Sequence, residues 1–154
     1  MGLEFDFSKL DAMDILDIAG YVEKEAEANY EELGVWCRTA APEVEAFFKK
    51  MAGWEARHGN QLNERRKTLF GNTPVRFTDS GAWEIESLDY DKVDGEMSLM
   101  DALNLALEAE KTAERYYAAA VEYLSDPETI AMFNELRNAE VQHQEMLKVE
   151  MAKH

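Results

Sequence analysis

Hydrophobic and polar residues follow a helical period in four segments of the chain. In each segment apolar side chains recur every three or four positions, which is the pattern of a helix that buries one face. Each segment is about 27 residues long, or about 40 Å at the helical rise of about 1.5 Å per residue. The pattern predicts an all-α protein. The segments cover residues 12–39, 42–69, 99–125 and 127–153.

Short connections separate the first segment from the second and the third from the fourth. Pro42 and Pro127 stand at first-turn positions, where a helix tolerates the missing N–H of proline. Ser98 and Asp101 have the spacing of a capping box, and Gly71 follows the second segment. Helices joined by only a few residues pack against each other, so we predict two antiparallel helical hairpins.

Residues 71–97, between the hairpins, contain turn-forming residues and no sustained period. A stretch of this length without regular structure is uncommon in a compact domain unless it has a function. At about 3.3 Å per residue it is long enough to run along a whole helix. A flexible linker between two domains is the alternative, but neither hairpin could bury its apolar face alone. We therefore expect one domain over residues 1–154, a four-helix bundle with a long crossover between the second and third helices.

Carboxylates and imidazoles interrupt each predicted buried face near its centre. A buried carboxylate without a partner is strongly unfavourable, so a layer of four requires compensation. Metal cations provide such compensation. The interrupting residues are Glu23 in the first segment, Glu55 and His58 in the second, Glu110 in the third, and Glu140 and His143 in the fourth.

Two of the helices carry the motif Glu-x-x-His, at Glu55 to His58 and at Glu140 to His143. Residues three apart lie on one helix face, so each motif can present a carboxylate and an imidazole to the same metal centre. In an acidic chain the motif also arises by accident as an exposed pair. Two occurrences among three histidines have chance odds of about one in eighteen, so the motif alone does not establish a metal site.

An internal repeat links the two halves of the chain. EKEAEANY at residues 23–30 resembles EKTAERYY at residues 110–117, so that Tyr30 and Tyr117 each follow a glutamate by seven positions. Each half then continues with a Glu-x-x-His motif on its next helix. A run of solvated charges would not require such a repeat.

The glutamates are also in register with the predicted turns. The midpoint between Glu23 and Glu55 falls in the first hairpin turn, and that between Glu110 and Glu140 falls in the second. Residues equidistant from the turn of an antiparallel hairpin lie at the same height. The repeat and this register together predict one metal site built by all four helices.

The ligand types favour iron or manganese, with zinc as a possible substitute. Four carboxylates balance the charge of two divalent ions, and mixed oxygen and imidazole ligands do not suit a thiolate-seeking metal. Six protein ligands for two ions leave coordination positions open for small molecules. Cys37 is the only cysteine, so the chain has neither an internal disulfide nor a CxxC pair. It lies on the predicted buried face, where we expect an inert thiol.

Charge narrows the classes of partner. Acidic residues outnumber basic ones by 32 to 16, for a formal net charge of -16. Such a surface repels phosphate backbones and anionic lipids, which argues against nucleic-acid and membrane binding. The same charge would also keep a bundle of no special function soluble. The acidic N-terminal residues lack the pattern of a signal peptide or a membrane span, so we expect a cytoplasmic protein.

With one glutamate and one Glu-x-x-His motif in each half, the sequence resembles the ferritin-like di-iron carboxylate proteins, and within them the rubrerythrins. The resemblance covers the whole chain and implies a ferritin-like bundle that holds two iron ions. It implies that Glu55 and Glu140 bridge the irons and that Glu23 and Glu110 are terminal carboxylates. It also implies that His58 and His143 are ligands and that Tyr30 and Tyr117 lie behind the ligands.

The resemblance also implies a function, the reduction of hydrogen peroxide or oxygen in defence against oxidative stress. Rubrerythrins commonly carry a further glutamate three residues after the third-helix ligand, where this chain has Ala113, and Glu114 is a poor substitute. The chain also lacks rubredoxin-type cysteines, so we expect an external electron donor such as a rubredoxin-like protein. Two alternatives remain: an iron-storage protein with ferroxidase activity of the ferritin type, and a structural acidic bundle that binds metal incidentally.

Four large aromatic residues fall off the predicted buried faces, and they suggest self-association. A homodimer is the expectation, with a larger shell as the alternative. These residues are Trp36, Phe47, Trp54 and Tyr116.

Overall fold

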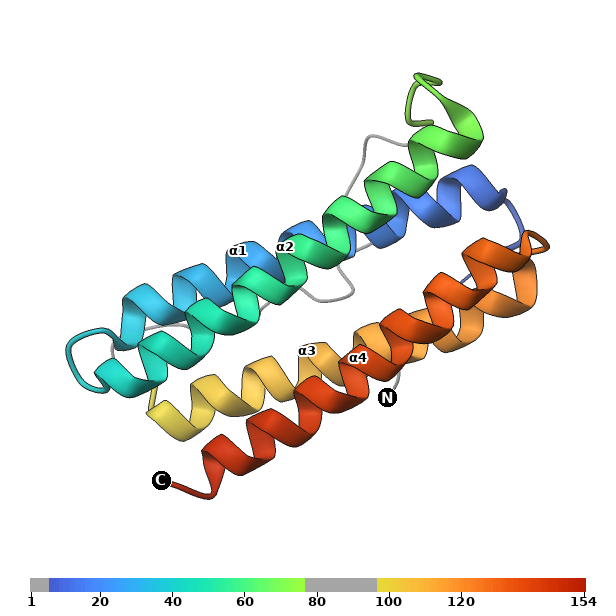
Figure 1. The fold of residues 1–154 in the computed structure, drawn as a ribbon. Helices are drawn as coiled ribbons and strands as arrows, with labels where there is room; N and C mark the ends of the chain where they lie inside the picture. The colour runs from blue at the N-terminus through green and yellow to red at the C-terminus, as the bar shows by residue number, and fades with distance from the viewer. Residues whose placement is uncertain (1–5, 77–96) are drawn as a thin grey trace.

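The computed structural model describes residues 6–76 and 97–154 and shows a four-helix bundle, which confirms the all-α prediction (Figure 1). The predicted boundaries are close to those observed. The largest difference is at the end of the third helix, whose last turn tightens into a 3-10 helix before Leu124 adopts an extended conformation. The elements are α1 (Ala12–Cys37), α2 (Pro42–Phe70), α3 (Leu99–Ala120), the 3-10 helix η2 (Val121–Tyr123) and α4 (Pro127–Met151).

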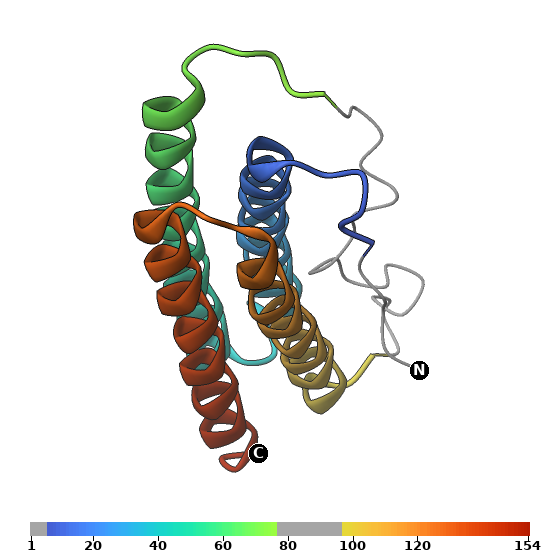
Figure 2. The same ribbon diagram turned by 90° about the vertical axis from the view of Figure 1, so that its right-hand side faces the viewer.

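The helices form two hairpins, α1 with α2 and α3 with α4, that pack against each other. The turns of the two hairpins lie at opposite ends of the bundle, so α1 runs antiparallel to α3 (Figures 1 and 2). The end of α2 and the start of α3 are likewise at opposite ends, as the predicted crossover requires. Residues 77–96 of that connection lie outside the described residues.

Local chemistry fixes where the helices begin. Asp11 and Asp14 form a reciprocal capping box at the start of α1, and Ser98 and Asp101 form the predicted one at the start of α3. The side chain of Asp126 caps α4 by accepting a hydrogen bond from the backbone N–H of Thr129. Pro42 and Pro127 occupy the first helical turns as predicted.

Two apolar clusters fill the bundle on either side of the glutamate layer. The first lies toward the turn between α1 and α2, and the second lies toward the turn between α3 and α4. Because both clusters are closely packed, they hold the polar layer between them at a fixed place in the bundle. The first contains Leu33, Cys37, Phe48, Met51, Leu103 and Leu147 among others. The second contains Ile15, Leu16, Leu62, Tyr116, Tyr117 and Phe133 among others.

Cys37 lies in the first cluster, as predicted, and is only 2% exposed. Burial raises the pKa of its thiol, which keeps the sulfur protonated and unreactive. Among the helices that the structure describes, none combines the length and the hydropathy needed to cross a lipid bilayer.

The prediction that Tyr116 lies on an outer face is wrong. Tyr116 is fully buried, and its hydroxyl donates a hydrogen bond to the carbonyl oxygen of Ile15 at 2.8 Å. Phe7, from the segment before α1, packs against the Tyr116 ring with 5.9 Å between centroids. The prediction failed because it assumed a single buried stripe, whereas α3 is covered on two sides.

The other three aromatic residues are half-buried and pack against the first apolar cluster rather than standing free on the surface. They therefore contribute to the core, and a homodimer interface built on them stays a prediction. These residues are Trp36, Phe47 and Trp54.

Candidate metal centre

Six side chains from the four helices converge at the middle of the bundle. Their oxygen and nitrogen atoms form two groups, and within each group the candidate ligand atoms lie within 4.8 Å of one another. The groups share two glutamates, Glu55 and Glu140. One group is Glu23, Glu55, His58 and Glu140, and the other is Glu55, Glu110, Glu140 and His143. The structure thus brings together all six residues predicted from the sequence, although that they bind metal stays a prediction.

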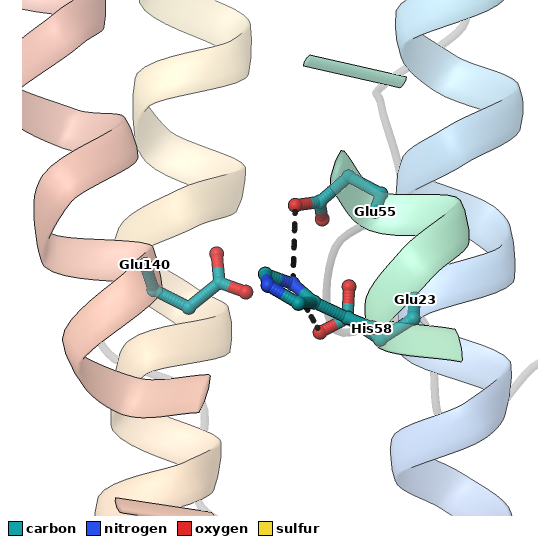
Figure 3. A group of neighbouring side chains, drawn as sticks. All are labelled: Glu23, Glu55, His58 and Glu140. Atoms are coloured by element: carbon teal, nitrogen blue, oxygen red, sulfur yellow. Dashed lines mark ion pairs between the residues drawn. The ribbon is translucent and has the colours of Figure 1, made fainter. Parts of the chain in front are cut away.

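The first group combines α1, α2 and α4, and Figure 3 shows its side chains pointing toward one another. The Nδ1 atom of His58 lies 3.6 Å from Glu23 Oε1 and 3.9 Å from Glu55 Oε1 (dashed lines in Figure 3). Glu55 and His58 reach the same point because they are one helical turn apart on α2. A cation among these atoms would contact ligands from three helices.

The second group repeats this arrangement in the other half. His143 Nδ1 lies 3.1 Å from Glu55 Oε1 and 3.3 Å from Glu110 Oε1. The two halves differ in exposure, since the side chain of His58 is 16% exposed and that of His143 is 6% exposed. The half of the site that contains His58 is therefore closer to solvent.

Two tyrosines connect the halves by hydrogen bonds that cross the bundle. Tyr30 on α1 donates its hydroxyl proton to Glu110 Oε1 on α3 at 2.5 Å, and Tyr117 on α3 donates to Glu23 Oε1 on α1 at 2.8 Å. The hydrogen bonds cross the bundle because α1 and α3 run antiparallel, so that each tyrosine lies opposite the glutamate of the other half. Each tyrosine thereby fixes the orientation of one carboxylate.

Glu110 is held as an anion. Burial by itself raises the pKa of this carboxyl, but its interactions with Glu140, His143 and Tyr30 outweigh burial and lower the pKa below its usual value. An anionic carboxylate is the form that binds a cation.

The buried atoms of the layer fit a pair of metal ions. All four glutamates are fully buried, and the second carboxylate oxygens of Glu23 and Glu110 make no hydrogen bond within the described residues. A buried polar atom left unsatisfied costs about 1–3 kcal/mol, and more when it is charged. A cation in each ligand group would satisfy one of these two oxygens, since Glu23 belongs to one group and Glu110 to the other. Carboxylate and imidazole ligands of this kind suit iron, manganese or zinc.

A model of the rubrerythrin family matches residues 14–151, from the first turn of α1 to the end of α4. This chain belongs to the rubrerythrin family. All six converging residues lie within the matched range. The rubrerythrin assignment agrees with the resemblance seen in the sequence.

Solved structures support the fold of this rubrerythrin-family chain. It is similar to the crystal structure of an uncharacterised conserved protein from Magnetospirillum magnetotacticum, with a TM-score of 0.78 and 21% identity over 92% of this chain and 94% of that one. It is also similar to a hypothetical protein from Pyrococcus furiosus, with a TM-score of 0.74 and 18% identity over 96% of this chain and 92% of that one. No curated protein is significantly similar to it in sequence.

The packing shows what stands at position 113, where the resemblance leads us to expect a further glutamate. Ala113 is fully buried among apolar residues of the second cluster, so no carboxylate enters the site there. Glu114 instead accepts a hydrogen bond from Gln144 Nε2 at 2.8 Å. Neither residue replaces the missing glutamate of the family pattern.

Sequence reasoning missed one neighbour of the site. The indole ring of Trp54 stacks on the His143 imidazole, with 5.5 Å between centroids and 16° between planes. Trp54 immediately precedes Glu55, and this adjacency was the only signal in the sequence that it lies beside the site. Its ring helps fix the orientation of His143.

Proposed function

We propose that this rubrerythrin-family chain is a non-haem di-iron oxidoreductase that reduces hydrogen peroxide to water. The observation that supports the proposal best is the pair of overlapping ligand groups sharing Glu55 and Glu140. In the balanced reaction, one peroxide accepts two electrons and two protons, its O–O bond breaks, and two water molecules form. A bound pair of iron ions would supply the two electrons.

The residues of the chain would divide the remaining tasks. Glu55 and Glu140 would bridge the two ions, Glu23 and His58 would bind one of them, and Glu110 and His143 would bind the other. The four carboxylates would neutralise two divalent cations.

Tyr30 and Tyr117 would hold the terminal carboxylates in place through the hydrogen bonds they already donate. The apolar clusters on either side would limit the access of bulk water to the centre.

Repeated turnover requires a reductant, because each reduced peroxide removes two electrons from the centre. The proposal therefore includes an external electron donor, for which a small rubredoxin-like protein is suitable. It also includes a cytoplasmic location. It further includes a homodimeric assembly, which light scattering would test.

An anaerobic titration of metal-free protein with ferrous iron, followed by rapid mixing with peroxide or with oxygen, tests the proposal. We expect saturation at two irons per chain, faster oxidation by peroxide than by oxygen, and many cycles of re-reduction without mineral growth. Oxygen-driven uptake far beyond two irons per chain would instead identify a storage protein. Iron binding that survives replacement of both Glu55 and Glu140 by Gln would identify a structural bundle with incidental metal binding.

A further inference from the structure

A cavity of about 450 Å³ lies between α1 and α2. Its lining includes the buried carboxylate of Glu55 and the exposed residues Lys24, Asn60 and Asn63, so it connects the surface with the proposed metal centre. A water molecule occupies about 30 Å³ in the liquid, so the cavity can hold several small molecules.

Two glycines leave this space open. A Cβ atom added at Gly20 would meet no atom within 4 Å, and one added at Gly59 would lie 3.7 Å from the Cβ of Glu23. Glycine inside a helix costs about 1 kcal/mol relative to alanine, so a mid-helix glycine calls for a reason in packing or function. Gly59 lies one turn after Glu55 and lines the cavity that reaches this carboxylate.

The internal repeat supplies a matched comparison within the same molecule. Gly59 on α2 corresponds to Gln144 on α4, and Glu27 on α1 corresponds to Glu114 on α3, because each lies one turn after an equivalent glutamate. In the α3–α4 half, Gln144 is buried and its Nε2 atom donates to Glu114 Oε1 at 2.8 Å. In the α1–α2 half, glycine has no side chain to make the same bond.

Gly20, like Gly59, stands where the other half of the chain has a larger side chain. Gly20 on α1 corresponds to Leu107 on α3, three residues before the repeated glutamate, and the Leu107 side chain is buried. Two side chains that fill the α3–α4 half are therefore absent from the α1–α2 half. The greater exposure of His58 than of His143 agrees with an opening on the α1–α2 side.

We propose that the cavity between α1 and α2 is the route by which hydrogen peroxide reaches the centre, and that the corresponding gap between α3 and α4 is closed by Gln144 and Glu114. This inference rests on the proposed function. The lining contains the carboxylates of Asp17, Glu27 and Glu55 and the cations of Lys24 and Arg66, and Arg66 pairs with Asp17 at 2.8 Å. A small neutral oxidant fits such a lining, because its charges nearly balance and the amides of Asn60 and Asn63 can hydrogen-bond a neutral polar molecule.

The variant that tests the route is Gly59→Gln, which gives α2 the residue that α4 has at the equivalent position. Its side chain would project toward Glu27 as Gln144 does toward Glu114. Gly59 does not have a positive φ, so the helix accommodates a side chain there and gains helix propensity. The matched control is Gly53→Gln on the exposed face of the same helix, where an added Cβ meets nothing within 4 Å.

Two rates are measured on protein loaded with ferrous iron under anaerobic conditions. One is the second-order rate of oxidation by hydrogen peroxide, and the other is the rate of nitric oxide binding, followed by visible absorbance. We expect both rates to fall about tenfold or more in Gly59→Gln and to stay within about twofold of wild type in Gly53→Gln. Both variants should still bind two irons per chain. Nitric oxide is small and neutral like peroxide, but its binding does not require turnover.

The two readouts separate the route from the proposed function. Nitric oxide binding that is equally fast in Gly59→Gln and Gly53→Gln would overturn the route, whatever peroxide does. Slow nitric oxide binding in Gly59→Gln, in a protein whose wild type ignores peroxide, would support the route and refute the peroxidase function. If Gly59→Gln fails to fold or to load iron, Gly20→Leu narrows the same cavity from α1 by copying Leu107, and the same expectations apply to it.

Discussion

At the scale of single residues, the carboxylates of Glu23 and Glu110 are each positioned by a hydroxyl from the opposite half of the chain. Tyr117 donates to Glu23, and Tyr30 donates to Glu110. Donors behind metal ligands set ligand orientation and basicity. The two bonds therefore hold each carboxylate in one orientation, in which it could bind a cation.

Replacing Tyr117 or Tyr30 by Phe tests this preparation. We expect each variant to weaken metal binding about 10–100-fold, because the carboxylate loses the hydroxyl that orients it. Ferrous or cobaltous titration of the metal-free protein measures the affinity. Tyr116→Phe is the control, since the Tyr116 hydroxyl donates a hydrogen bond to the carbonyl oxygen of Ile15. Equal affinities in all three variants would show that the tyrosines only fill the core.

The sequence was sufficient to locate the six converging residues because their spacing repeats and because they are in register with the turns. It was insufficient for contacts that depend on which neighbour covers a helix face. Tyr116 packs against Phe7 from outside the helices, and the hydrogen bond between Gln144 and Glu114 joins α4 to α3. Neither contact follows from periodicity within one helix.

At the scale of helices, an arginine joins the C-terminal half of α2 to the start of α4. The Arg65 guanidinium contacts Asp126 Oδ2 at 2.6 Å and Glu128 Oε2 at 2.7 Å. Asp126 also accepts hydrogen bonds from the backbone and hydroxyl of Thr129. One carboxylate thus caps α4 and ties it to α2, which helps keep the two Glu-x-x-His helices at fixed relative height.

Asp126→Asn tests the charge of the contact with Arg65 separately from helix capping, because asparagine can still cap α4. The hydrogen bonds from Thr129 and Arg65 lower the pKa of the Asp126 carboxyl. A carboxyl with a lowered pKa stabilises the fold above its unfolded-state pKa of about 3.9, and the stabilisation is lost as pH falls through the folded-state pKa. The variant should therefore unfold more easily than wild type near neutral pH.

Urea unfolding from about pH 7 down to about pH 2 measures the effect, and the deficit of Asp126→Asn should be full above about pH 4 and shrink below it. Glu135→Gln removes an exposed carboxylate from the same helix and should leave stability nearly unchanged at every pH. A deficit in Asp126→Asn that is constant with pH would assign the effect to geometry rather than charge.

Helix boundaries were predictable where a residue with a fixed preference stands at the end. Pro42, Pro127 and Ser98 marked the starts of three helices correctly. The end of α3 was placed several residues too late, because residues 121–125 carry no strong breaker and the chain leaves the α-helix through a 3-10 turn. Such a gradual ending has no clear sequence signal.

At the scale of the whole molecule, the two apolar clusters stabilise a bundle whose central layer opposes folding. Carboxylates buried this close together repel one another when they are ionised, and the packing on both sides, together with the hydrogen bonds from Tyr30 and Tyr117, holds them in place. A cation that binds the folded layer and not the unfolded chain converts this repulsion into attraction. Metal binding and stability are therefore linked through the same residues.

Anaerobic unfolding with and without ferrous iron measures that linkage. At a free metal concentration about 100 times Kd, one binding event adds about 2.7 kcal/mol to the free energy of unfolding. We expect at least this increment in wild type and almost none in the double variant Glu55→Gln, Glu140→Gln, which removes both shared ligands.

The increment, rather than absolute stability, is the informative quantity, because removing two buried charges also relieves repulsion in the metal-free form. The double variant Glu64→Gln, Glu135→Gln makes the same charge change at exposed positions on α2 and α4 and should retain the full increment. If both double variants keep it, the cation binds elsewhere on the acidic surface. If only the exposed pair keeps it, the cation that stabilises the whole bundle depends on the two glutamates that its halves share.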